Sequence, residues 1–262
     1  MSTTSVIPKH WVDKGPWPIM TTPQGEGQDT NSHYSVFLAT DMCHVHNLFI
    51  RAMNSVYLQC PYVTDQADIA DLLFYTKTLV ITIDAHHDSE EKYLFPELAA
   101  YTKNPKIMAV NQAQHAAFHG GLEKLGEYCT TTSPADYSSV TFRAMIDSFA
   151  PQLFKHLNDE IPTILALKQY PSEDLKTIWT KTEQHIDDVG SFDEMFPLAF
   201  GCMDKGFEAG QHKFPPAPFF MEYVVRYWFA RKHSGAWRFN PCDMRGNPRQ
   251  LLFIPTEEDQ KP

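Results

Sequence analysis

Apolar residues recur at helical spacing along the first two thirds of the chain and predict four long amphipathic helices. The pattern predicts them over residues 31–58, 65–94, 105–128 and 137–168, with Pro96 ending the second. Four long helices joined by connections of moderate length are typical of an all-α fold, the up-down-up-down four-helix bundle. The clearest stripe belongs to the last helix and consists of Ile146, Phe149, Leu153, His156, Glu160, Ile164 and Leu167.

The two ends of the chain lack this repeat. Residues 1–30 are rich in Pro, Gly and Thr and predict an extended N-terminal arm, with Trp11 and Trp17 packed on the bundle. Residues 171–262 are rich in aromatic residues and Pro, and helices are expected there only over 172–189 and 219–232. A segment of this size and composition is poorly suited to build its own core. We therefore expect three parts, which are an arm at 1–30, a bundle at 31–170, and a C-terminal extension at 171–262 packed on the bundle.

Ionisable side chains interrupt the apolar faces of all four predicted helices. Three pairs lie four residues apart, a spacing that puts both members on one helix face. Such groups are costly to bury unless something satisfies them. Five imidazoles and two carboxylates are too rich in nitrogen for magnesium or calcium and too rich in carboxylate for structural zinc, so they favour two redox-active metal ions, iron first. The predicted ligands are His46, His86, Glu90, His115, His119, His156 and Glu160.

Neighbouring histidines offer alternative ligands. The pair His87 and Glu91 has the same spacing as the pair chosen on the second helix, but the phase of the preceding apolar residues favours the chosen pair. His44 competes with His46, but it points about 160° away around the helix and off the apolar stripe. The remaining histidines have no partner at ligand spacing, and these are His10, His33, His185, His212 and His233.

Composition narrows the classes of partner. The net charge is −10 and no basic stripe is present, which argues against nucleic acid. No apolar run approaches the roughly 20 residues of a membrane span, and no N-terminal segment has the order of a signal peptide. The five cysteines include no C-x-x-C pair, which argues against a disulfide framework or a zinc ribbon. We expect a cytoplasmic protein with neither nucleic acid nor a membrane as its partner, and the oligomeric state stays open.

The ligand segments resemble those of the hemerythrin-like family, the HHE cation-binding proteins. The resemblance covers about residues 32–170 and has every ligand type in the family's order. It is carried by residues 46–47, by HHDSEEKYLFPEL at 86–98, by QHAAFHGGL at 114–122 with EKLGEY after it, and by KHLNDEIP at 155–162. Two C-terminal runs, at 214–220 and 234–243, resemble extensions found on fungal hemerythrin-like proteins.

This resemblance implies a non-haem di-iron centre inside the bundle. In the family, three histidines hold one iron and two hold the other, two carboxylates and an oxo or hydroxo bridge join them, and the second iron has an open position for dioxygen. Carried over by motif, the first set is His115, His119 and His156, the second set is His46 and His86, and the bridging carboxylates are Glu90 and Glu160.

The implied function is the binding or activation of dioxygen, or of a related small ligand, at this centre. One departure is that oxygen-carrying hemerythrins have an Asp five residues after the last histidine, whereas here Glu160 follows His156 by four, a variant that HHE-type relatives share. One alternative is a di-iron oxidoreductase, an oxidase or monooxygenase, acting on a small organic substrate in a pocket formed with residues 171–262. Another is an iron or oxygen sensor. A sizeable apolar cavity joining the metals to the extension would favour the enzyme.

Overall fold

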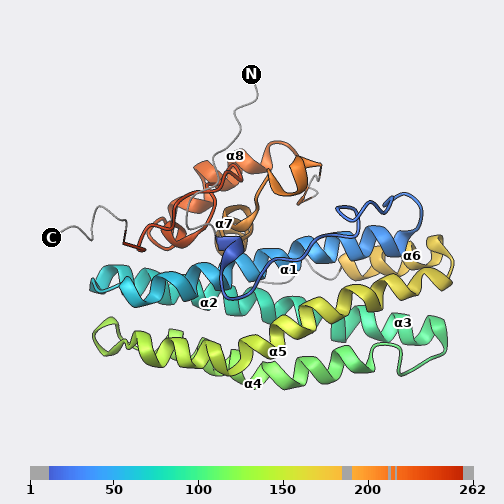
Figure 1. Ribbon diagram of the computed structural model, residues 1–262, viewed down its shortest axis with the longest axis horizontal. Helices are drawn as coiled ribbons and strands as arrows, with labels where there is room; N and C mark the ends of the chain where they lie inside the picture. The colour runs from blue at the N-terminus through green and yellow to red at the C-terminus, as the bar shows by residue number, and fades with distance from the viewer. Residues whose placement is uncertain (1–11, 185–190, 212–213, 216, 256–262) are drawn as a thin grey trace.

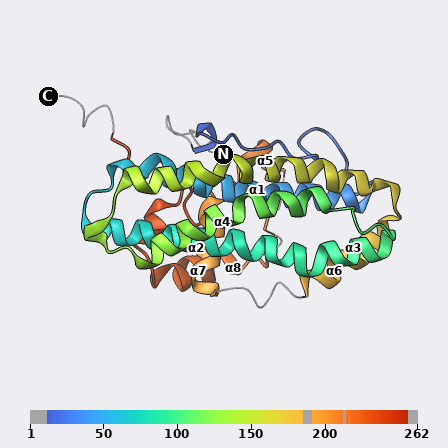
Figure 2. The same cartoon turned by 90° about the horizontal axis from the view of Figure 1, so that it is seen from below.

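Four long helices form an antiparallel bundle in the computed structural model, which describes residues 12–184, 191–211, 214–215 and 217–255. Figures 1 and 2 show the four rods lying side by side with their directions alternating. No β-strand occurs among the described residues. The predicted all-α bundle is confirmed, and its helices are α1 (Tyr34–Gln59), α2 (Gln66–Ser89), α4 (Ala109–Thr131) and α5 (Ser139–Ala166).

Three of the four bundle helices begin where a capping side chain accepts hydrogen bonds from their first backbone N–H groups. His33 caps α1 and accepts a hydrogen bond from the Ser35 N–H. Asp65 does the same for α2, and Ser138 accepts from the Thr141 N–H at the start of α5. Such caps are worth about 1 kcal/mol each. The helix starts therefore lie within a few residues of those predicted from the sequence.

The second rod does not end at Pro96, contrary to the sequence prediction. A single π-helical turn, Glu90–Leu94, follows α2 and leads directly into α3 (Phe95–Thr102). The Phe95 N–H donates to the Glu90 carbonyl five residues back, and Pro96 then occupies the first turn of α3, where its missing N–H costs little. The rod stops instead at Lys103, which adopts a left-handed conformation with φ of 53°. Single π-helical turns such as Glu90–Leu94 are frequent at functional sites.

Helices α4 and α5 approach each other closely at Gly121. A Cβ atom on Gly121 would lie 2.5 Å from the Phe149 Cβ on α5, whereas a Cβ on its neighbour Gly120 would meet nothing within 4 Å. Two adjacent glycines inside a helix lower its stability and are typical of a place where another group approaches the backbone closely. Only Gly121 has that role.

Substitution of the two neighbouring glycines is expected to have opposite effects. Gly121→Ala should destabilise the protein by about 1–2 kcal/mol, because the clash with Phe149 outweighs the gain in helix propensity. Gly120→Ala should stabilise it by up to about 1 kcal/mol, since it gains the same propensity without a clash. Urea unfolding of the two variants measures both changes. Equal effects would show that the backbones are not in contact at this point.

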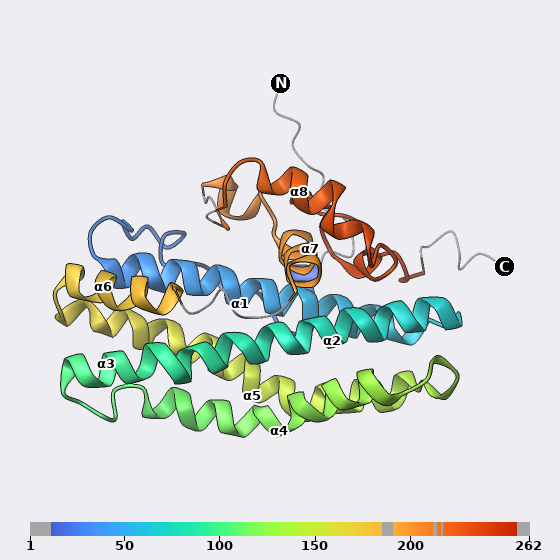
Figure 3. The same cartoon turned by 180° about the vertical axis from the view of Figure 1, so that it is seen from behind.

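The C-terminal residues pack on one side of the bundle, over α1 and α2 (Figures 1 and 3). Their helices are α6 (Ser172–Glu183), α7 (Phe192–Cys202) and α8 (Met221–Tyr227). The Ser55 hydroxyl donates to the Phe239 carbonyl, and Arg238 pairs with Asp68 and Asp71 of α2. Helix α7 was not predicted, the predicted helix over 219–232 is shorter than expected, and the end of the one predicted over 172–189 lies outside the described residues.

The described part of the N-terminal arm is tied to α1 by polar side chains. Asn54 donates to the carbonyls of Val12 and Trp17, and Arg51 makes a two-pronged pair with Asp13 at 2.7 and 3.0 Å. Trp17 is buried, as predicted, with its ring centroid 5.1 Å from that of Tyr57. Trp11, for which the same was predicted, lies outside the described residues. Among the described helices, none is both long and apolar enough to cross a membrane.

Candidate metal centre

Side chains from all four helices converge at the middle of the bundle in two overlapping groups of metal-ligating type. Within each group the ligand atoms lie within 4.8 Å of one another. Helix α1 contributes His46, α4 contributes His115, and the others come from α2, its π-helical turn and α5. The three-histidine group is His87, Glu90, His115 and His156, and the two-histidine group is His46, His86, Glu90 and Glu160.

Glu90 is the residue common to both groups, and each of its oxygens faces a different one. Its Oε1 lies 3.1 Å from the His86 Nε2, whereas its Oε2 lies 3.6 Å from the His115 Nε2. Glu160 also lies between the groups, with its Oε2 3.4 Å from the His46 Nε2 and 3.7 Å from the His156 Nε2. Both carboxylates are therefore placed as bridges between two sets of imidazoles.

The carboxylate oxygens at the centre lack hydrogen-bond partners of their own among the described residues. Glu90 is 2% exposed and Glu160 is 0% exposed, and none of their four carboxylate oxygens makes a hydrogen bond of ordinary geometry among the described residues. The Nε2 of His87 also has no hydrogen-bond partner among the described residues. Buried carboxylates without partners are costly. Cations between these donors would satisfy them all, so the donor set fits a pair of metal ions.

Backbone and side-chain acceptors hold the outer nitrogens of the histidines. The Nδ1 of His46 donates to the Leu157 carbonyl at 2.9 Å, and that of His87 donates to the Ile83 carbonyl at 2.8 Å. The Nδ1 of His115 lies 2.8 Å from the Glu91 Oε1. A proton held on Nδ1 leaves the Nε2 lone pair free, and that lone pair faces the centre. The three imidazoles are thus oriented as metal ligands.

His119 is where the structure departs from the predicted ligand set. Its side chain is 54% exposed, belongs to neither group, and has its Nε2 3.6 Å from the Asp84 Oδ1. The reason is the phase of α4, whose buried stripe runs through Asn111, His115, Phe118, Leu122 and Leu125. Phe118 therefore takes the interior place one turn after His115, and His119 lies about 100° further around the helix.

His87, and not His119 as predicted, is the third histidine of the three-histidine group. The sequence interpretation set His87 with Glu91 against His86 with Glu90, whereas the structure brings both histidines and Glu90 into the centre. Glu91 stays at the surface, hydrogen-bonded to His115. A signal for His87 was present, because buried residues continue at alternating steps of three and four through Thr76, Val80, Ile83, His87, Glu90 and Leu94. The competing His44 packs on the outer side of α1 against Phe207 and Phe214.

The comparison with protein families agrees with this geometry. Residues 40–167 match the model of the hemerythrin HHE cation binding domain. The bundle belongs to the hemerythrin family. No solved structure gives a significant match to the chain. The match thus covers α1 from residue 40, all of α2, α4 and α5, and every residue of both ligand groups, while the C-terminal extension lies outside it.

Gln114 links one ligand of the hemerythrin domain to the surface. The His156 Nδ1 lies 3.4 Å from the Gln114 Oε1, and the Gln114 Nε2 donates to the Asp159 Oδ2 at 2.6 Å. Asp159 is in turn paired with Lys155. Because the amide nitrogen is committed to Asp159, the amide oxygen is left to accept the His156 proton. Gln114 therefore fixes the tautomer of a buried ligand.

Removal of this link is expected to weaken metal binding without abolishing it. Gln114→Leu should lower affinity for the ion beside His156 by about 10–100-fold, because an unheld imidazole loses its orientation and basicity. Titration with Co²⁺ against a chelator of known affinity measures the change. Gln152→Leu, a substitution at an exposed position of α5, is the matched control and should leave the affinity unchanged. An equal loss in both variants would contradict the role of Gln114.

Burial shifts the titration of the whole hemerythrin centre toward uncharged forms. Burial, with a smaller contribution from Glu90, raises the pKa of Glu160 to about 7. Burial and the neighbouring Glu91 raise the pKa of Glu90 well above its usual value. Burial lowers the pKa of His86 to about 4 and that of His156 further. Protons thus take the place of cations in the metal-free protein.

The pH dependence of metal uptake is expected to follow the carboxyl groups rather than the imidazoles. Burial lowers the pKa of His86 to about 4, so this imidazole is already neutral at pH 6, whereas Glu160, with its pKa of about 7, must still lose a proton when a cation binds. Affinity should therefore rise by up to about tenfold per pH unit for each released proton and keep rising through pH 7. Co²⁺ titrations between pH 5.5 and 8 test this. A plateau reached by pH 6.5 would contradict it.

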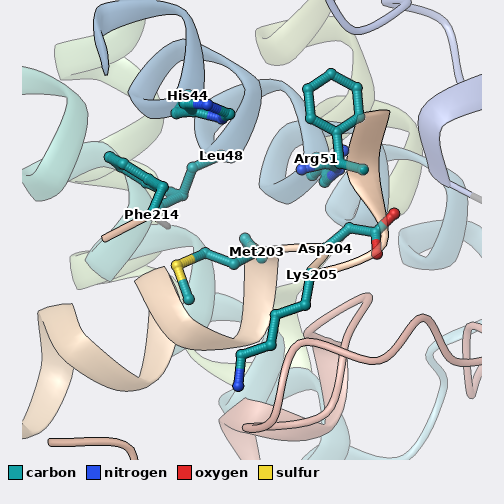
Figure 4. A pocket seen from close by; sticks show the side chains of 9 residues that line it. His44, Leu48, Arg51, Met203, Asp204, Lys205 and Phe214 are labelled. Atoms are coloured by element: carbon teal, nitrogen blue, oxygen red, sulfur yellow. The ribbon is translucent and has the colours of Figure 1, made fainter. Parts of the chain in front are cut away.

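Two kinds of cavity lie near the centre. The first, the α2/α4 cavity, has a volume of about 260 Å³ and is lined only by residues of those helices and the turn between them, including the ligands His87 and His115. The second kind lies between α1 and the extension, around His44 and Phe214, with a space of about 30 Å³ beside Arg51 (Figure 4) and one of about 290 Å³ beside Phe37 and Asp41. No ligand of either group lines these two spaces. The centre is therefore reached from the bundle side.

Proposed function

We propose that the hemerythrin domain holds two iron ions and binds dioxygen at them. The observation that supports this most strongly is Glu90, whose two oxygens face different sets of imidazoles as a bridging carboxylate requires. Five imidazoles with two carboxylates suit iron and favour its ferrous state. Two ferrous ions would supply an open coordination position and the electrons that dioxygen binding needs.

The residues of this chain would hold the ions and keep the surroundings apolar. His87, His115 and His156 would hold one ion, and His46 with His86 the other. Aromatic rings flank the ligands: the Phe95 ring stacks on His115 at 5.6 Å, and the Phe49 ring lies 5.3 Å from that of His86. Such rings exclude water from the imidazoles they cover. Because the α2/α4 cavity reaches His87 and His115, the small ligand would approach from the three-histidine side.

The alternative of an oxidase with an organic substrate in the extension has less support. The cavities that residues 171–262 form with α1 around His44 have volumes of about 30 and 290 Å³, and no residue of either ligand group lines them. The extension would then serve as a structural cover for α1 and α2. All five cysteines are free and buried, which supports the reducing, cytoplasmic setting that we propose for the protein.

The test is anaerobic loading with ferrous ion, followed by exposure to oxygen. We expect two iron ions per chain and a visible charge-transfer band that appears with oxygen and disappears when oxygen is removed. A band that decays irreversibly with consumption of an added organic reductant would favour the oxidase instead. Absence of bound iron, or two bound ions with no response to oxygen, would contradict the proposal.

A further inference from the structure

The α2/α4 cavity joins the protein surface to the buried centre. Helices α2 and α4 lie next to each other along their length (Figure 2). The side chains around the cavity form a gradient of exposure: His119 is 54% exposed and Asp84 45%, whereas His115 is only 5% exposed. His119 and Asp84 therefore form the rim of the cavity, and the ligand histidines form its floor.

The two side chains at the rim, His119 and Asp84, do not form a good hydrogen bond with each other, and both can act as ligands of a cation. The His119 Nε2 and the Asp84 Oδ1 are 3.6 Å apart, too far for a good hydrogen bond but close enough for both to reach one metal ion with little movement. Two more carboxylates, Asp88 and Glu91, line the same cavity. Asp88 is paired with Lys92, so Asp84 and Glu91 give the cavity its negative charge.

A residue at the floor of the cavity provides independent evidence that the cavity admits a cation. His87 is 5% exposed, lines the cavity, and has an Nε2 without a hydrogen-bond partner among the described residues. His119 also lies one helical turn from the ligand His115, so a cation at the rim would be close to the next nitrogen donor. The cavity thus leads from an exposed histidine–carboxylate pair to a buried imidazole whose Nε2 has no hydrogen-bond partner among the described residues.

We propose that Asp84 and His119 form a transient site for a divalent metal ion and that the α2/α4 cavity is its entrance to the centre. This inference rests on the proposed function in one respect, namely that the centre takes up metal ions. It explains why a histidine one turn after a ligand is exposed and faces a carboxylate. His119 would deliver metal and would not be a permanent ligand.

The test is the rate of metal uptake, with Co²⁺ as the probe. Metal-free protein is mixed with Co²⁺ in a stopped-flow instrument, and the visible absorption of the bound ion reports its arrival. His119→Gln and Asp84→Asn should each slow uptake about tenfold, because the local concentration of cation at the rim falls. Both variants should still bind two ions per chain with the wild-type final spectrum. Asp147→Asn, at an exposed position of α5, changes the net charge as Asp84→Asn does and should leave the rate unchanged.

Three outcomes would overturn the inference. Uptake at the wild-type rate in both variants, with two ions bound, would overturn the entrance alone and leave the proposed function intact. A final content of one ion in His119→Gln would show that His119 is a permanent ligand. Failure of the wild-type protein itself to bind Co²⁺ would overturn the metal centre and the entrance together. Circular dichroism of each variant checks that the fold is unchanged.

Discussion

Glu90→Gln is expected to remove both metal ions from the centre. Glu90 is the one residue present in both ligand groups, with one oxygen near His86 and the other near His115. A neutral amide cannot bridge two cations and also withdraws one of the two buried negative charges that offset them. Metal analysis after loading should fall from two ions per chain to nearly none. Retention of two ions would show that Glu90 is not the bridge.

The same substitution should make the metal-free protein more stable. The folded-state pKa of Glu90 is raised, so its contribution to stability is complete below the unfolded value near 4.5 and is lost as pH rises through the raised value. Glutamine has no such loss. At pH 8 metal-free Glu90→Gln should therefore be more stable than metal-free wild type, by about 1–3 kcal/mol.

An exposed glutamate on the same bundle provides the control. Glu127→Gln, on α4, should change neither the metal content nor the stability of the metal-free protein. Added metal should stabilise the wild type and Glu127→Gln but not Glu90→Gln, because only ligands that bind the folded state shift the unfolding equilibrium. Thermal unfolding with and without metal measures all three proteins. A Glu90→Gln variant less stable than wild type without metal would show that the carboxyl group has a partner in the fold.

The bundle could be predicted because each helix carries its own signal. Apolar spacing gives the start of each long helix within a few residues, with capping residues at α1, α2 and α5, whereas Pro96 does not mark the end of the second rod. The short helices of the extension carry no such repeat. Helix α7 contains Pro197 and is held in place by distant residues, as when Asn240 donates to the Pro197 carbonyl. Packing across the chain determines these elements, and local sequence does not encode it.

The sequence predicts a site of histidines and carboxylates inside the bundle, but the two groups that the structure brings together differ from the predicted residues at one position. On α1 and α5 the ligands coincide with an unbroken apolar stripe, so the phase is unambiguous. On α4 the spacing of four between His115 and His119 satisfies a motif, yet the buried stripe continues through Phe118. On α2 two adjacent histidines both face the centre, just before the rod widens into its π-helical turn at Glu90. The spacing of the motif alone does not distinguish these cases, whereas the buried stripe of each packed helix does.

His87→Gln is expected to remove one of the two metal ions. His87 is one of three imidazoles in its group, and its Nδ1 bond to the Ile83 carbonyl fixes its Nε2 toward the centre. Two imidazoles and a shared carboxylate hold a divalent ion much more weakly than three imidazoles do. The other group retains His46, His86 and both carboxylates. Metal analysis should therefore fall from two ions per chain to about one.

The matched comparison is His119→Gln, because the sequence motif and the structure assign the third histidine differently. The structure places the His87 ring inside the bundle and leaves that of His119 at the surface beside Asp84. His119→Gln should therefore retain both ions at equilibrium. If His119→Gln lost an ion while His87→Gln kept both, the motif would identify the ligand correctly, and α4 would have to rotate when metal binds. Unequal losses in the expected direction would instead establish that two consecutive histidines of α2 each serve a different ion.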